Sequence, residues 1–180
     1  MPRINTVSAD VASDESKQLF GQVQRKLGRV PNLMQSLGHS AAALGGYLAL
    51  NDSLSRGVLS SKDRERIALT VAARHGCGYC TAAHSAIGNM VGLTEAQIHD
   101  ARRGGSNDTQ VDSLLRFVHR ILETKGHVED ADLESFRSAG YSDAAVAEVV
   151  AHIGLNVLTN FFNSVAETEI DFPRVEALAS

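Results

Sequence analysis

The chain has 180 residues and a mass of 19.2 kDa, so one domain can bury a sizeable apolar core without disulfide bridges. A hydrophobic content of 43% with only 3 prolines excludes a disordered or proline-rich chain. The formal net charge of -4 supplies no positive field, so we expect no nucleic-acid partner.

Apolar periodicity and capping residues predict a succession of helices, and no strand pattern of comparable strength occurs. In chain order, the predicted helices cover residues 14–27, 40–55, 61–74, 77–90, 94–103, 108–124, 130–138 and 142–165. The chain is expected to break at Pro31, and Gly57 is expected to end the second helix. We therefore predict an all-α fold with a single domain over residues 1–180 and a glycine-rich boundary between halves near 104–107.

The amino terminus lacks the basic start and apolar stretch of a secretory signal, which predicts a cytoplasmic location. The most apolar segment, residues 144–162, is interrupted by polar side chains, so we expect no membrane span. The chain has 2 cysteines, Cys77 and Cys80, in one Cys-x-x-Cys stretch. In a reducing compartment such a pair is more often redox-active or metal-binding than a structural disulfide.

The spacing of the two cysteines places Cys77 and Cys80 on one helix face, near enough to close into a disulfide. At a helix start, free N–H groups and the helix dipole favour a thiolate. His84 follows Cys80 by one turn and can relay a proton to or from its sulfur. Cys80 is therefore predicted to attack a peroxide. Cys77, nearer the helix start, is predicted to be the more exposed sulfur and the one that a reductant attacks.

Glu65 joins this group only if the chain folds back. In one continuous helix it would lie roughly 18 Å from Cys77. A break at residues 75–76 allows a helical hairpin, in which Glu65 and His84 come to nearly the same level on opposite arms. A carboxylate at that place can orient and charge the imidazole.

Glu65, the Cys77–Cys80 pair and His84 together resemble the E…CxxCxxxH signature of the AhpD-like alkylhydroperoxidases, within the carboxymuconolactone decarboxylase superfamily. Residues 31–34 (Pro-Asn-Leu-Met) and 169–173 (Glu-Ile-Asp-Phe-Pro) resemble an uncharacterised peroxidase-related branch of that family. The resemblance implies an AhpD-like bundle of about seven to eight helices built from helical hairpins, assembled into trimers or hexamers.

The same resemblance implies hydroperoxide reduction in which Cys80 is peroxidatic, Cys77 is resolving, and Glu65 and His84 form a proton relay. The expected function is a thiol-dependent peroxidase acting on organic hydroperoxides or hydrogen peroxide through sulfenic acid and then a disulfide. An external dithiol, on a lipoylated or thioredoxin-like protein, would reset the pair. No cofactor and no metal are expected.

The sequence is also compatible with two other functions. One is a carboxymuconolactone decarboxylase-like enzyme acting on a lactone acid, although such members generally do not depend on a Cys-x-x-Cys pair. The other is a non-peroxidase thiol–disulfide or zinc-binding protein, with His75, Cys77, Cys80 and His84 as the ligands.

Three further residues are candidate accessory groups: Tyr79, His152 and Asn156. Some relatives carry a histidine at the position of Tyr79, and a phenol with an ordinary pKa near 10 is a poorer relay at neutral pH. His152 and Asn156 belong to a polar stripe, from Glu148 to Asn160, that recurs every four residues along an apolar helix. Such groups either form hydrogen bonds between helices or at a subunit contact, or border the peroxide pocket.

Overall fold

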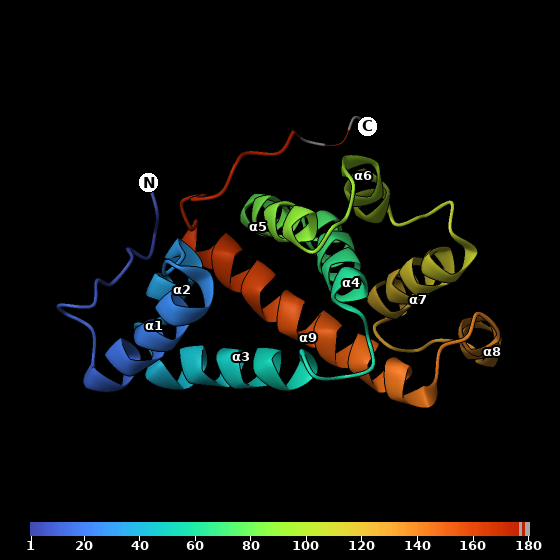
Figure 1. Cartoon of the computed structure of the whole chain (residues 1–180), viewed down its shortest axis with the longest axis horizontal. Coiled ribbons are helices and arrows are strands. Elements are labelled where there is room, and N and C mark those ends of the chain that lie inside the picture. Colours follow the sequence, from blue (N-terminus) through green and yellow to red (C-terminus); the bar gives the residue numbers. More distant parts are fainter. Residues whose placement is uncertain (177, 179–180) are drawn as a thin grey trace.

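A computed structural model describes residues 1–176 and 178 of the chain (Figure 1). Within these residues the chain forms nine α-helices and no strand, which confirms the all-α prediction. The helices are α1 (Asp14–Leu27), α2 (Asn32–Leu37), α3 (Ala41–Leu54), α4 (Ser61–Arg74), α5 (Gly78–Met90), α6 (Glu95–Arg103), α7 (Thr109–Thr124), α8 (Asp130–Ser138) and α9 (Asp143–Ala166).

Short polar side chains begin most of these helices. Each accepts a hydrogen bond from a backbone N–H of the first turn, which would otherwise have no partner. The residues that cap in this way are Ser13, Ser40, Ser60, Thr94, Asp108 and Ser142. Because such caps can be read from the sequence, the observed helix starts agree closely with the predicted ones.

Helix α2 is absent from the predicted helices, because Pro31 predicts a break in the chain and not the start of a helix. Pro31 instead occupies the N-cap position with φ −61° and ψ 154°. Proline lacks an N–H and has a fixed φ, so it is well tolerated where a helix begins. Burial of Leu33, Met34 and Leu37 then holds this short helix against the core.

Gly57 does not end α3, contrary to the prediction from glycine capping. The helix ends at Leu54 with Ser55 in right-handed conformation. The Glu148 carboxylate of α9 accepts hydrogen bonds from the backbone N–H groups of Val58 (2.7 Å) and Leu59 (3.0 Å). It fills the space where a Cβ at residue 57 would lie, so glycine is needed there for close approach.

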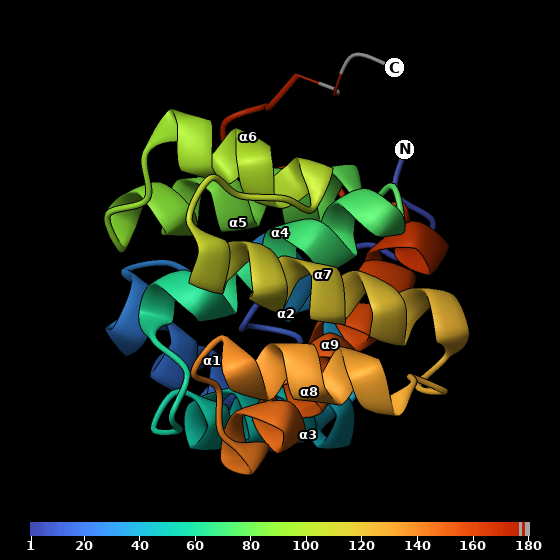
Figure 2. The same cartoon turned by 90° about the vertical axis from the view of Figure 1, so that its right-hand side faces the viewer.

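Helices α4 and α9 form the centre of the molecule. In Figure 1, α9 crosses the middle, with α1 to α3 on one side and α4 to α7 on the other. Helix α9 packs against α2, α3, α4, α5 and α7, and α4 packs against α5, α6, α7 and α9. The view in Figure 2 shows α7 and α8 lying over this centre. Residues 104–107, the predicted boundary, fall in the connection from α6 to α7.

Helix α9 is long and apolar enough, by length and composition alone, to cross a membrane, with 44% of its apolar window buried inside the fold. Its polar stripe is buried as well, since His152, Asn156, Asn160 and Asn163 are each at most 5% exposed. Because α9 buries four polar side chains and packs against five other helices, it is a core helix of this fold.

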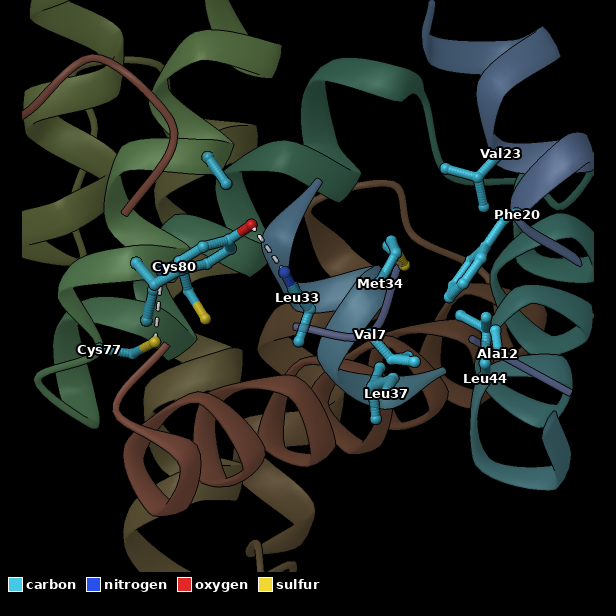
Figure 3. Close-up of a cluster of buried hydrophobic side chains, with 13 residues drawn as sticks. Val7, Ala12, Phe20, Val23, Leu33, Met34, Leu37, Leu44, Cys77 and Cys80 are labelled. Carbon is cyan, nitrogen blue, oxygen red and sulfur yellow. Dashed lines mark hydrogen bonds between the residues drawn. The ribbon is translucent and has the colours of Figure 1, made fainter. Parts of the chain in front are cut away.

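The buried side chains form three clusters. One lies among α4, α7, α8 and α9, and a smaller one among α4, α6 and α7. The third joins α1, α2 and α3 to α5, and it includes Tyr79 and both cysteines (Figure 3). The sulfur pair therefore belongs to the apolar interface between the N-terminal helices and α5.

The turn from α4 to α5 is as short as two helices allow. Gly76 has φ +64°, its N–H bonds to the carbonyl of Ala73 (3.2 Å), and the N–H of Cys77 bonds to the carbonyl of Ala72 (3.0 Å). These are the two bonds of a Schellman motif, which satisfies the last carbonyls of α4. Cys77 then serves as the N-cap of α5, so one residue closes α4 and opens α5.

Replacing Gly76 by Ala should lower the free energy of unfolding by about 1 kcal/mol, because a Cβ is strained at this positive φ. No atom lies within 4 Å of that Cβ position, so only backbone strain acts. The measurement is urea unfolding. Gly46→Ala, in the interior of α3 with open space around it, is the matched control and should leave stability unchanged or raise it. Equal stability of Gly76→Ala and the parent protein would contradict this account of the turn.

Candidate functional site

The two sulfurs lie against each other at the start of α5. The backbone N–H of Cys80 donates to Cys77 Sγ over 3.3 Å, as the dashed line in Figure 3 shows, and both cysteines are free thiols. From α9, Asn163 Nδ2 donates to Cys80 Sγ over 3.2 Å. The spacing prediction that the pair shares one face is thus met, with backbone and side-chain donors directed at both sulfurs.

Cys77 is predicted to be the more exposed sulfur, and the difference is marginal, because Cys77 is 4% and Cys80 is 2% exposed. Both cysteines are therefore buried. The C-terminal segment lies close to them, since Ile170 packs against the same cluster, 3.7 Å from the position of a Cβ on Gly78.

The sulfurs differ in acidity because they share a proton. The thiol of Cys80 donates to Cys77, and this hydrogen bond outweighs burial and lowers the pKa of Cys77 to about 7. The Cys80 N–H and the charge of His84 act in the same direction. The pKa of Cys80 is raised, first by this shared hydrogen bond and then by burial. The singly ionised pair therefore carries its thiolate on Cys77.

The hairpin brings Glu65 of α4 to His84 of α5, as its geometry predicts. Glu65 Oε2 lies 2.8 Å from His84 Nδ1, and both side chains are less than one-fifth exposed. Burial lowers the pKa of His84, but the charge and hydrogen bond of Glu65, together with the charge of Cys77, raise it by more. The imidazole is thus held in one orientation and favoured in its protonated form.

A cavity of about 330 Å³ opens beside this pair. Cys80, Glu65 and His84 all line it, whereas Cys77 does not. Most of its other lining residues are apolar. They come from α1, the start of α2, α3, α5 and the C-terminal segment: Val23, Leu27, Pro31, Leu33, Met34, Leu48, Ala83, Ile87 and Phe172. A small organic molecule in this cavity would meet the sulfur of Cys80 and not that of Cys77.

Tyr79 lines the cavity with its ring but uses its hydroxyl elsewhere. The hydroxyl donates to Asp171 Oδ1 (2.8 Å) and accepts from the N–H of Leu33 (3.1 Å, dashed in Figure 3). Burial and the Asp171 carboxylate raise the pKa of Tyr79 above its ordinary range, although the Leu33 bond opposes the shift. In this structure the candidate accessory group Tyr79 ties α5 to α2 and to the C-terminal segment.

Asp171 is the centre of that tie. Its Oδ2 accepts from Arg29 (2.7 Å) and from the N–H of Asn32 (3.1 Å), while its Oδ1 accepts from Tyr79. The Arg29 guanidinium also lies 4.4 Å from the centre of the Phe172 ring, which itself lines the cavity. The C-terminal segment is therefore fastened across the cavity by one carboxylate.

His152 and Asn156 lie on α9 away from the cavity. Asn156 Nδ2 donates to the carbonyl of His152 (2.8 Å), and neither residue is among those that line the cavity. The groups of α9 that do reach the site are Thr159, which lines the cavity, and Asn163, which touches Cys80. Both were missed, although extending the polar stripe by steps of three and four residues leads from Asn156 to each of them.

Among residues 1–176 and 178, no three His, Cys, Asp or Glu side chains come together in a way that could hold a metal ion. The imidazole of His75, one of the four ligands of the zinc alternative, instead packs edge-on against Phe161 with 5.2 Å between ring centres. The geometry therefore gives no support to a zinc site built from these residues.

Residues 40–119 match the carboxymuconolactone decarboxylase family. The fold is similar to that of an uncharacterised peroxidase-related protein with an alkylhydroperoxidase AhpD core from Ralstonia eutropha JMP134, with 23% identity, TM-score 0.86, and coverage of 94% of this chain and 92% of that one. A peroxidase-related protein from Silicibacter sp. TM1040 gives 25% identity, TM-score 0.80, and coverage of 92% and 91%.

A third similar structure is a variant of the debrominase Bmp8 in complex with 2,3,4-tribromopyrrole, with 17% identity, TM-score 0.78, and coverage of 93% of this chain and 91% of that one. At this identity the likeness concerns the fold alone. No curated protein gives a significant sequence match.

Asp171→Asn should release the C-terminal segment, because a neutral amide cannot accept from Arg29, Asn32 and Tyr79 together. We expect a loss of about 1 to 2 kcal/mol in the free energy of unfolding. Faster proteolytic cleavage within residues 167–176 should accompany it. Asp14→Asn, at a side chain 94% exposed, is the control and should change neither quantity. An unchanged cleavage rate in Asp171→Asn would show that other contacts hold the segment.

Proposed function

We propose that the chain is an AhpD-like, thiol-dependent peroxidase, because residues 40–119 match the carboxymuconolactone decarboxylase family and the fold is similar to that of peroxidase-related proteins. Its proposed substrates are organic hydroperoxides or hydrogen peroxide. One observation carries the proposal: Cys80 lines the same cavity as the Glu65–His84 pair. A nucleophilic sulfur and a positioned proton donor thus face the same space.

In the first step the sulfur of Cys80 attacks the terminal oxygen of R–O–OH. An S–O bond forms and the O–O bond breaks, so the sulfur is oxidised to sulfenic acid while the peroxide is reduced to an alcohol. The Cys80 proton passes to the Cys77 thiolate, with which it already shares a hydrogen bond. The departing alkoxide takes its proton from the imidazolium of His84, which Glu65 favours.

In the second step Cys77 attacks the sulfenic sulfur of Cys80. An S–S bond forms, the S–OH bond breaks, and the Cys77 proton leaves with the hydroxyl group as water. An external dithiol then reduces this disulfide by thiol–disulfide exchange and returns two protons to the pair. Cys80 is thus the proposed peroxidatic residue and Cys77 the resolving one.

The burial of both sulfurs bears on the reductant. Glycines at 76 and 78 flank Cys77 and are exposed, so this side offers the shortest approach to the pair. A lipoyl group on a flexible arm is narrow enough to enter there, and a thioredoxin-like protein would need the segment around Ile170 to move. The proposed reductant is a lipoylated or a thioredoxin-like protein, and Cys77 is the sulfur that it would attack.

Assembly into a homo-oligomer, a trimer or hexamer, is also part of the proposal. It rests on the family resemblance and on one face of α9, where four apolar side chains are exposed: Val150, Leu158, Phe161 and Val165. Leu158, Phe161 and Val165 recur at three- and four-residue steps and Val150 lies two turns before Leu158, so they form a stripe that a second copy could cover.

The single-cysteine variants test the assignment of the two sulfurs. Cys80→Ser should reduce peroxide consumption to the uncatalysed background, because the cysteine that lines the cavity is lost. Cys77→Ser should consume one equivalent of peroxide and stop, with a stable sulfenic acid on Cys80. Trapping with a dimedone-type reagent followed by peptide mass spectrometry makes the measurement. Sulfenic acid on Cys77 in the Cys80→Ser variant would reverse the assignment.

The alternative functions give different results in the same protein samples. A decarboxylase-like enzyme would act on a lactone acid with both cysteines replaced. A zinc protein would hold stoichiometric zinc in its reduced form and react slowly with peroxide. Either result would refute the peroxidase proposal.

Glu65→Gln tests the proton relay through its pH dependence. Glu65 raises the pKa of His84, so its loss should lower that pKa. The imidazolium exists below this pKa, and the alkaline limb of the pH–rate profile for oxidation of the reduced protein should therefore move to lower pH. Glu123→Gln on the exposed face of α7 is the control. An unmoved alkaline limb in Glu65→Gln would remove the Glu65–His84 pair from the relay.

A further inference from the structure

The cavity beside Cys80 contains a phenol that the proposed mechanism does not use. Tyr47, on α3, lines the cavity together with Cys80, Glu65 and His84, and it packs against the core cluster that contains both sulfurs. It is half-buried and comes from α3, whereas Cys80, Glu65 and His84 come from the α4–α5 hairpin.

The other hydroxyl, carboxyl and imidazole groups around the cavity are already engaged, including Asp52, which accepts a hydrogen bond from Arg56. Glu65 and His84 bond to each other, Tyr79 bonds to Asp171, and the Thr159 hydroxyl donates to the carbonyl of Asn156. Among residues 1–176 and 178, no residue forms a hydrogen bond with the Tyr47 hydroxyl, in contrast to these neighbours. A donor is therefore left free to serve a molecule in the cavity.

Electrostatics keep that donor protonated. Burial raises the pKa of Tyr47 well above its ordinary value, and the charge of Glu65 raises it further. Tyr47 is thus a permanent O–H donor at any physiological pH, unlike His84, which titrates.

We propose that Tyr47 is a further catalytic residue, which donates a hydrogen bond to the leaving oxygen of the peroxide while Cys80 attacks the other oxygen. This inference rests on the proposed peroxidase function. As the O–O bond breaks, negative charge grows on the leaving oxygen, and a fixed O–H donor stabilises that charge more than it stabilises the bound peroxide. The proton that completes the alcohol still comes from His84, so Tyr47 keeps its own.

The test is Tyr47→Phe, which removes one oxygen and keeps the ring that packs on the core. The rate constant for oxidation of the reduced protein by tert-butyl hydroperoxide should fall about 10- to 100-fold. Peracetic acid leaves as a stabilised carboxylate and needs little help, so its rate constant should fall much less. A change in packing would slow both peroxides alike, and this comparison therefore separates a catalytic role from a structural one.

Tyr141→Phe is the matched control, because Tyr141 stacks on Phe136 in the cluster remote from the sulfurs and should react as the parent protein does. Equal rate constants for the parent and Tyr47→Phe with both peroxides would overturn the inference while leaving the peroxidase proposal standing. No oxidation of the parent protein by either peroxide would instead overturn the proposed function itself.

Discussion

The α4–α5 turn is the constraint on which the candidate site depends. Cys77 completes the Schellman motif of α4 and caps α5, so only residues 75–77 separate the two helices. Because the turn is this short, the distance along each arm fixes which residues face one another, and Glu65 meets His84. A single inserted residue would rotate α5 by about 100° and separate that pair. The geometry of the turn therefore sets both the sulfur pair and its proton relay.

The turn also divides the work between the sulfurs. Cys77, at the N-cap, receives the N–H of Cys80 and has the lower pKa, so it holds the negative charge of the reduced pair. Cys80, three residues on, faces the cavity and keeps the proton. In the proposed peroxidase, nucleophile and base therefore belong to one pair, in which Cys80 on the cavity side is activated by Cys77.

The parts of the site that could be predicted from the sequence depend on local spacing. Helix caps, the Cys77–Cys80 pair and the meeting of Glu65 with His84 follow from helix geometry and one break in the chain. Long-range packing could not be predicted in this way. The bond from Tyr79 to Asp171 joins residues 92 positions apart, and it fastens the C-terminal segment beside the cluster that contains Cys77. The small difference in exposure between Cys77 and Cys80 could not be predicted, because nothing near them in sequence indicates that this segment packs there.

Different segments supply the chemistry and the shape of the cavity. The family match over residues 40–119 includes α3 to α6 and most of α7, and hence Tyr47, Glu65, both cysteines and His84. The remaining walls come from α1, the start of α2, Thr159 of α9 and Phe172 of the C-terminal segment, all outside the match. These segments form part of the cavity wall, so substitutions in them can change the shape of the cavity, and hence which molecules fit, without altering the sulfurs.

The central claim is that the reduced pair shares one proton, with the thiolate on Cys77. Thiolate absorbance near 240 nm, followed against pH in the reduced protein, tests it most directly. The account predicts one thiolate forming with a midpoint of about 7, and the loss of that step in Cys77→Ser. Persistence of the step in Cys77→Ser, or two thiols titrating together at an ordinary cysteine pKa, would contradict the account.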